Sequence, residues 1–449
     1  MATGTASGSP ELPEKLALAR DSAPARISYI FFKRRKETPQ KRVMEMSLSS
    51  RGAVSVFLVG AVAAGVTTLS ACGSQDAAAA APPTSSPADT ARSQARGLAL
   101  ADPTGPYTVG RDSLHLVDKA RRDPWVPKAD HRELMVSMYY PAHKATGKTT
   151  PYMSTKGADA FLKQMELDVP AKTIAGTKTH THTGARPATG KFPLIVLSPG
   201  FKTPGATLTG LAEDLTSRGN VVAVVDHAYE AAGVSFPGKG ILPCAACGKV
   251  GPTTFQPAAE GRAKDISFTL DQLLSGTSPW KRAGMVDKNK VGMAGHSLGG
   301  ASTAATMEKD SRVRAGVNMD GPYINSGLSS GLSGRPFMLL GTKADHSPGG
   351  DATWDTAWKQ LEGWKRWATL TGAEHMSFTD LAPLAGQLGA DDPEGLPGKR
   401  AAEITRDYVG AFFDKQLHGK HEPLLDHPSK THPEVTLQHH ASENPSPRS

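Results

Sequence analysis

Short apolar runs alternate with helical segments along the middle of this chain, and this alternation constrains the fold. The runs at 192–200, 220–227 and 289–297 are rich in apolar residues, as in strands buried on both faces. Segments with helical spacing, 207–219 and 259–276, lie between them. Strand and helix in this order require parallel strands joined by crossover helices. We therefore predict an α/β fold with a mostly parallel central sheet and helices on both faces.

The alternation extends in both directions. An earlier segment, 132–141, alternates apolar and polar residues and predicts an antiparallel strand. Toward the C-terminus the pattern predicts a helix through Met307, strands over 314–320 and 335–342, a tryptophan-rich helix over 354–367, a strand over 367–372 and a helix over 401–416. We expect the folded domain to span 103–420. Ligands of such sheets bind beyond the carboxyl ends of the strands.

A serine between two glycines follows the strand predicted over 289–297. Gly295, Ser297 and Gly299 form a G-x-S-x-G motif that ends this strand and opens a helix. A glycine-rich turn would give the same letters. Between a strand and a helix, however, the motif predicts a strained turn in which any side chain at either glycine would collide with its neighbours. The context favours Ser297 as a nucleophile, with the backbone N–H of Leu298 pointing at an oxyanion.

A serine nucleophile requires a general base, and the base requires an orienting acid. In the α/β-hydrolase fold the acid and then the histidine follow the serine along the chain. His375, in the turn after the last predicted parallel strand, fits the base, whereas His346 comes too early in that order. Asp320 and Asp345 both follow predicted parallel strands. Spacing alone does not choose between these two acids.

Five segments, in this order, resemble bacterial relatives of the type II platelet-activating factor acetylhydrolases: SPGF, VVDHAYE, GHSLGG, NMDGPY and EHMSFTDL. The resemblance spans about residues 103–420. NMDGPY and HMSFTD carry most of it, because GHSLGG is shared by many lipases. The resemblance implies the α/β-hydrolase fold and the set of Ser297, Asp320 and His375. It also implies that the backbone N–H of Phe201 is the first oxyanion donor.

The resemblance implies a serine ester hydrolase that works through an acyl-enzyme, without cofactor or metal. Its expected substrates are small esters or lipids, including short-acyl phospholipids of the platelet-activating factor type. Related polyester hydrolases take their acid from the next strand, so a polyester or cutinase-like hydrolase using Asp345 is an alternative. A catalytically inactive surface binding protein on the same fold is another. Pro199 replaces a histidine of the animal enzymes in the SPGF turn.

Several residues near these motifs have two interpretations. His227, Tyr229 and Glu230 follow a predicted strand and either wall the site or pack the loop. The tryptophans between 354 and 367 are expected to pack helix against sheet, with binding of a substrate's acyl chain as the alternative. Asp265 is expected on the solvated face of its helix.

An apolar segment near the N-terminus predicts export. Residues 52–72 end in LSAC, which resembles the bacterial lipobox. We predict a lipoprotein-type signal peptide over 44–72, with the lipid on Cys72; a transmembrane anchor is the alternative. Residues 1–43 are then an N-terminal extension ahead of the working start, and 73–102 a disordered spacer. The expected location is the outer face of the bacterial cell membrane, or secreted.

The charge distribution argues against one class of partner, and the two remaining cysteines predict a disulfide. The net charge is +8, but residues 1–72 hold ten of the 51 Lys and Arg residues and five of the 43 Asp and Glu residues, so the rest carries +3. Without a basic stripe, a nucleic-acid partner is not expected. Cys244 and Cys247 in PCAACG predict a local disulfide, because a metal site would need further ligands nearby. The Pro- and His-rich residues 421–449 are predicted to be a disordered tail.

Overall fold

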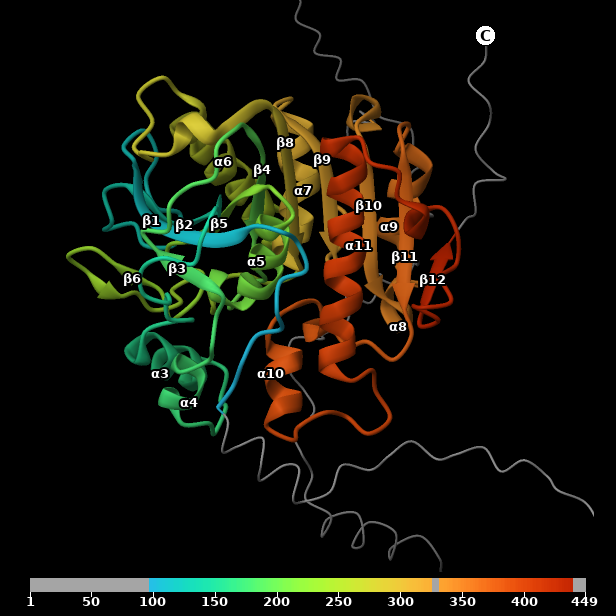
Figure 1. Cartoon of the computed structure of the whole chain (residues 1–449), viewed down its shortest axis with the longest axis horizontal. Coiled ribbons are helices and arrows are strands. Elements are labelled where there is room, and N and C mark those ends of the chain that lie inside the picture. The colour runs from blue at the N-terminus through green and yellow to red at the C-terminus, as the bar shows by residue number, and fades with distance from the viewer. Residues whose placement is uncertain (1–96, 325–330, 439–449) are drawn as a thin grey trace, which may run out of the picture. The chain divides into compact units, whose positions relative to one another are not determined.

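The computed structural model describes residues 97–324 and 331–438 (Figure 1). The predicted extension (1–43), signal peptide (44–72) and lipidation site at Cys72 lie outside the described residues. Within the described part of the chain, no helix combines the length and the apolar character needed to cross a membrane.

Ten strands form one sheet: β1 (Thr108–Asp118), β2 (Arg132–Ala142), β3 (Thr181–Thr183), β4 (Phe192–Ser198), β5 (Val221–His227), β8 (Val286–His296), β9 (Val313–Met319), β10 (Phe337–Thr342), β11 (Lys365–Leu370) and β12 (Val435–Gln438). Their order across the sheet is β12, β11, β10, β9, β8, β4, β5, β2, β1, β3. The strands from β11 to β5 are parallel, while β2 and β12 flank them antiparallel. The short strands β6 (Ser235–Phe236) and β7 (Gly240–Ile241) pair separately.

Helices cover both faces of the sheet. The helices of the described residues are α3 (Thr155–Gln164), α4 (Ala171–Ala175), α5 (Thr209–Ser217), α6 (Phe255–Leu274), α7 (Leu298–Lys309), α8 (Lys343–His346), α9 (Ala352–Gln360), α10 (Leu381–Gln387) and α11 (Gly398–His418). Single 3₁₀ turns are η1 (Gly205–Leu208), η2 (Ala283–Met285), η4 (His375–Phe378) and η5 (Pro423–Leu425), while η3 (Gly331–Gly334) is a turn whose inner residues have positive φ.

Two apolar cores hold the layers together. Residues of α6, α7 and α9 pack with one face of the sheet. Residues of α5 and α11 pack with the other face, and α11 lies in front of the strands in Figure 1. Every residue of β4 and β5 is buried, because both faces of these strands are covered. The predicted α/β fold, with a mostly parallel sheet between two helical layers, is confirmed.

A smaller cluster lies at the end of the sheet where α8 follows β10. There α3, α4 and α10 lie together (Figure 1), and their apolar residues share a cluster with the first described residues of the chain. This is the end at which the parallel strands finish and at which a ligand of an α/β sheet binds.

The predicted folded domain, 103–420, is too short at both ends. Leu98 and Leu100 are buried, and Leu100 N–H donates to Lys178 O at 3.0 Å, so the domain begins within the predicted spacer. At the other end η5 buries Leu425 and β12 pairs with β11, so residues 421–438 are not a disordered tail. A strand of four residues in Pro-rich sequence has too short an alternation to be recognised.

The tryptophan-rich segment is not one helix. Helix α9 ends at Gln360, and Trp367 belongs to β11. A Cβ at Gly363 would lie 1.9 Å from Gly334 O, so the chain turns there against neighbouring backbone instead of continuing as a helix.

Candidate active site

Ser297 stands in a strained turn between β8 and α7. Its backbone has φ 56° and ψ −119°, a left-handed conformation that a side chain disfavours. The Ser297 N–H donates to Met319 O at 2.8 Å, which ties the turn to the end of β9. As the residue that caps α7, Ser297 lies at the positive end of the helix dipole. The predicted sharp turn from strand to helix is therefore present.

The two motif glycines permit this turn by close packing. A Cβ at Gly295 would lie 2.2 Å from the backbone carbonyl of Gly299. A Cβ at Gly299 would lie 2.0 Å from Ser198 O, at the end of β4. Both distances are far below van der Waals contact, so the predicted collisions are confirmed. The first turn of α7 thus rests directly on the backbone of β4.

His375 and Asp320 meet at the same end of the sheet. His375 opens η4 after β11, and Asp320 directly follows β9. His375 Nδ1 lies 2.6 Å from Asp320 Oδ2, and Thr342 N–H donates to Asp320 Oδ1 at 2.7 Å. The side chain of Asp345 instead accepts from Thr342 Oγ1 at 3.1 Å, at the start of α8. The structure therefore brings Asp320, and not Asp345, to His375.

The electrostatics of Asp320 favour its ionised form. Burial by itself raises the pKa of Asp320, but the hydrogen bond and charge of His375, followed by the charge of His346, outweigh burial and lower the pKa to about 2. An ionised carboxylate accepts from Nδ1–H of His375 and leaves Nε2 as the proton acceptor. This is the tautomer that a general base requires.

His296, the residue before the serine, contacts the turn that carries His375. Its Nε2 lies 2.8 Å from the carbonyl oxygen of His375, and the two ring centroids are 4.6 Å apart. Burial, and next the charge of His375, lower the pKa of His296 to about 3. The neutral ring therefore donates its Nε2–H to that carbonyl. Sequence reasoning missed this role, since the residue before the serine carries no signal of its contact.

Phe201 lies in the turn between β4 and η1. Its side chain is buried, and Lys202 N–H donates to Glu230 O at 3.1 Å. A Cβ at Gly200 would lie 2.8 Å from His296 Nδ1, so this turn packs against the residue before the serine. The SPGF turn and the elbow at Ser297 are therefore neighbours, as a shared oxyanion site requires.

Comparison with known proteins assigns a family to this arrangement. The model of the family described as platelet-activating factor acetylhydrolase, isoform II, matches residues 94–239 and 272–392. The chain belongs to this family. The resemblance inferred from the five sequence segments is confirmed.

Individual relatives of this acetylhydrolase-family protein are esterases. The chain is similar to a probable 1-alkyl-2-acetylglycerophosphocholine esterase of Arthroderma benhamiae, 29% identical over 75% of this chain and 93% of that protein. It is similar to the platelet-activating factor acetylhydrolase of Cavia porcellus, 25% identical over 59% of this chain and 65% of that protein. A solved ferulic acid esterase from Streptomyces cinnamoneus matches with a TM-score of 0.68 and 42% identity, over 76% of this chain and 99% of that chain. The protein is a serine hydrolase acting on carboxylic ester bonds.

A second histidine stands behind Asp320 in this acetylhydrolase-family site. His346 Nε2 lies 3.4 Å from Asp320 Oδ1, and its Nδ1 lies 3.0 Å from Asp351 Oδ2. Burial opposes protonation, but the hydrogen bond and charge of Asp351, with the charge of Asp320, outweigh it and raise the pKa of His346. The ring stacks on Trp354, with centroids 4.1 Å apart. Trp354 and Trp367 are fully buried, as expected of core tryptophans.

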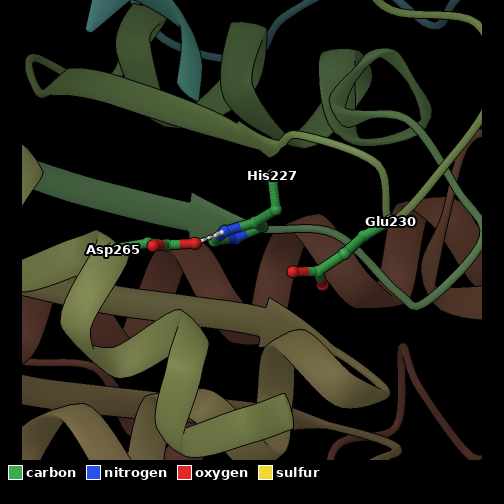
Figure 2. Close-up of side chains that lie close together, drawn as sticks. All are labelled: His227, Glu230 and Asp265. Carbon is green, nitrogen blue, oxygen red and sulfur yellow. Dashed lines mark hydrogen bonds and ion pairs between the residues drawn. The ribbon is translucent and has the colours of Figure 1, made fainter. Parts of the chain in front are cut away.

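His227, Glu230 and Asp265 form a buried charged cluster beside the SPGF turn. In Figure 2, His227 at the end of β5 faces Asp265 on α6, and Glu230 extends toward them from the loop after β5. His227 Nδ1 lies 2.7 Å from Asp265 Oδ2. The expectation of a solvated Asp265 is wrong: its side chain is completely buried. His227 and Glu230 pack under the loop and do not wall an open site.

Two arginines that sequence reasoning missed neutralise this cluster. Arg132 from β2 contacts Asp265 at 2.8 Å and Glu230 at 2.7 Å, and Arg262 from α6 contacts Glu230 at 2.7 Å. Burial alone would raise the pKa of Asp265, but the charge of Arg132 and the hydrogen bond of His227 hold it well below its usual range. Three metal-ligating residue types lie together here. Guanidinium groups already supply the positive charge that a cation would bring.

The loop after β5 is closed by a disulfide. Cys244 and Cys247 are joined, as predicted. Between them, Ala246 N–H donates to Tyr229 O at 3.0 Å. The disulfide loop therefore lies against the residue next to Glu230 and braces the loop that carries the charged cluster.

Proposed function

We propose that the protein hydrolyses esters through an acyl-enzyme on Ser297, with His375 as the general base and Asp320 as its orienting acid. The 2.6 Å approach of His375 Nδ1 to Asp320 Oδ2, beside the strained elbow, is the observation that supports these roles. Ser297 Oγ attacks the ester carbonyl carbon while His375 Nε2 takes the hydroxyl proton. The C–O bond to the alcohol then breaks, and His375 returns the proton to the leaving oxygen. Water repeats the same steps and releases the acid.

The oxyanion of each tetrahedral intermediate is proposed to lie between the backbone N–H groups of Phe201 and Leu298. Leu298 is the first residue of α7, so its N–H points along the helix axis at the positive end of the dipole. Each such donor contributes about 3 kcal/mol to lowering the barrier in related chemistry.

The proposed substrate is an ester with a short acyl group on a lipid-like alcohol. Family membership and the similarity to a probable 1-alkyl-2-acetylglycerophosphocholine esterase support this class. An ester of an aromatic acid is the second candidate, supported by the 42% identity to a ferulic acid esterase. A polyester is tested beside them as the alternative substrate, although its expected acid, Asp345, accepts a hydrogen bond from Thr342 and does not contact His375.

A substrate panel separates these candidates. Purified protein would be given p-nitrophenyl esters from acetate to dodecanoate, a 2-acetyl phosphocholine lipid, methyl ferulate and a polyester film, and kcat/KM would be compared. We expect the acetyl lipid to exceed methyl ferulate, and the Ser297→Ala variant to lose activity on every ester. Retained activity in that variant would refute the mechanism. Failure of a fluorophosphonate probe to label Ser297 would favour a catalytically inactive binding protein.

We also propose that the protein is exported and held at the outer face of the cell membrane by a lipid on Cys72. The lipobox-like sequence LSAC at 69–72 supports this location. Mass spectrometry of the mature chain is the test: a first residue of acylated Cys72 is expected, and an unmodified chain that starts elsewhere would contradict it.

A further inference from the structure

A second chain of serine, histidine and aspartate lies next to the candidate catalytic residues. Ser198 Oγ is 3.1 Å from His227 Nε2, and His227 Nδ1 is 2.7 Å from Asp265 Oδ2. The connectivity is that of a catalytic triad, but Ser198 and Asp265 have no exposed surface. Ser198 Oγ also receives a hydrogen bond from Arg262 at 3.2 Å. A serine so enclosed cannot meet an ester, so this set serves another purpose.

The position of Ser198 indicates that purpose. Ser198 ends β4, and Phe201 follows it by three residues in the same turn. Arg262 Nη1 donates both to Ser198 Oγ and to the carbonyl oxygen of Pro199. Beyond Phe201, Lys202 N–H donates to the carbonyl oxygen of Glu230 at 3.1 Å. The turn is therefore held on both sides of the proposed oxyanion donor.

One cluster supplies both of these anchors. Arg262 Nε donates to Glu230 Oε2 at 2.7 Å. The residue that anchors the turn ahead of Phe201 is therefore bound to the residue that anchors it after Phe201. Arg132 bridges Glu230 to Asp265 and so ties the histidine's acid to the same cluster. Figure 2 shows His227, Glu230 and Asp265 gathered around this point.

The charges around His227 determine which atom donates in each hydrogen bond between Asp265, His227 and Ser198. Burial, and next the charge of Arg262, lower the pKa of His227. The neutral ring donates Nδ1–H to the ionised Asp265, so Nε2 accepts a hydrogen bond from the Ser198 hydroxyl. The Ser198 oxygen is then oriented to accept from Arg262. Pro199 has no N–H, so its carbonyl is the one backbone group of that residue through which the turn can be fixed.

We propose that Arg262 and His227, with Asp265 behind it, are positioning residues of the oxyanion hole, which hold the turn so that the Phe201 N–H faces the reacting carbonyl. This inference rests on the proposed function. The effect is exerted on the transition state, because the oxyanion exists only there and in the tetrahedral intermediates.

The test compares Ser198→Ala, His227→Gln and Arg262→Met with the wild type. We expect kcat for p-nitrophenyl acetate to fall about 10- to 100-fold in Arg262→Met, and less in Ser198→Ala, because misplacing one oxyanion donor removes part of its contribution. KM should change less than twofold. The affinity for a trifluoromethyl ketone, whose adduct on Ser297 carries an oxyanion, should fall by the same factor as kcat/KM.

Controls separate positioning from loss of fold. Arg312→Met removes a partly exposed arginine that pairs with Asp310 and Asp271 away from the site, and should leave both kinetic constants unchanged. Ser198→Ala, the mildest change, keeps the proposal testable if Arg262→Met does not fold. If Ser198→Ala and His227→Gln both fold and bind the trifluoromethyl ketone as tightly as the wild type, the positioning role is overturned. If instead wild type and Ser297→Ala hydrolyse esters equally, the proposed function itself has failed.

Discussion

At the scale of single residues, the orientation of His375 is set from two directions. Asp320 binds its Nδ1 at 2.6 Å, and the ring of His296 binds its backbone carbonyl at 2.8 Å. The side chain and the turn that carries it are thus fixed by different partners. The serine and histidine could be predicted from motif and chain order. The choice of acid could not, because Asp320 and Asp345 both follow parallel strands, and only the packing of their loops decides which one reaches the base.

Paired substitutions of the two aspartates test this choice. In Asp320→Asn, kcat should fall by about 10⁴, because an amide can donate to Nδ1 and so favours the wrong imidazole tautomer. Asp345→Asn should change kcat less than about threefold, since its side chain contacts Thr342 and not His375. Steady-state kinetics on p-nitrophenyl acetate would measure both. A collapse in Asp345→Asn, with Asp320→Asn active, would assign the acid to the polyester-hydrolase position.

At the scale of elements, the site depends on how closely α7 approaches β4. The first turn of the helix touches the Ser198 carbonyl through Gly299, and the same Ser198 ends the strand that leads to Phe201. The regular strands and helices around the elbow could be predicted from apolar periodicity. The burial of Asp265 could not, because its ion-pair partner Arg132 lies 133 residues away on β2. A polar residue on a helix indicates solvent unless a distant partner is known.

A glycine pair tests the helix-to-strand contact. Gly299→Ala should lower stability by about 1–3 kcal/mol or more and reduce kcat, since the added methyl would lie 2.0 Å from Ser198 O. Gly261→Ala, within α6 with open space around it, is the matched control and should raise stability by up to about 1 kcal/mol. Urea unfolding of both variants gives the comparison. Equal stability in the two variants would show that the close approach is not needed.

At the scale of the whole molecule, buried carboxyl groups make stability depend on pH. Glu213 of α5 is buried, its Oε1 accepts from His180 N–H at 2.8 Å, and its other oxygen has no hydrogen-bond partner. Burial, with the charge of Asp380, raises the pKa of Glu213 to about 8. Burial likewise raises the pKa of Asp380 to about 7. The fold therefore retains protons that the unfolded chain releases at lower pH.

The resulting prediction has a defined sign. In the unfolded chain Glu213 loses its proton near pH 4.5, and in the fold near pH 8, so its contribution to stability falls as pH rises between these values. Glu213→Gln keeps the shape without the charge and should gain about 4 kcal/mol over the wild type at pH 8, with little gain at pH 4. Urea unfolding at the two pH values measures this. An identical pH profile for both proteins would contradict it, and the exposed Glu394→Gln serves as the control.

The last described strand, β12, affects whether copies of the protein associate through the edge of the sheet. β12 caps the backbone of β11, whose last four residues are buried. A chain cut after residue 420 would leave the N–H and C=O groups along this edge unsatisfied, and another molecule could pair with them. Such a truncated enzyme should elute as oligomers in size-exclusion chromatography, whereas a cut after residue 438 should not cause self-association. By pairing with β11, the short strand β12 is expected to prevent other molecules from pairing with that edge of the sheet.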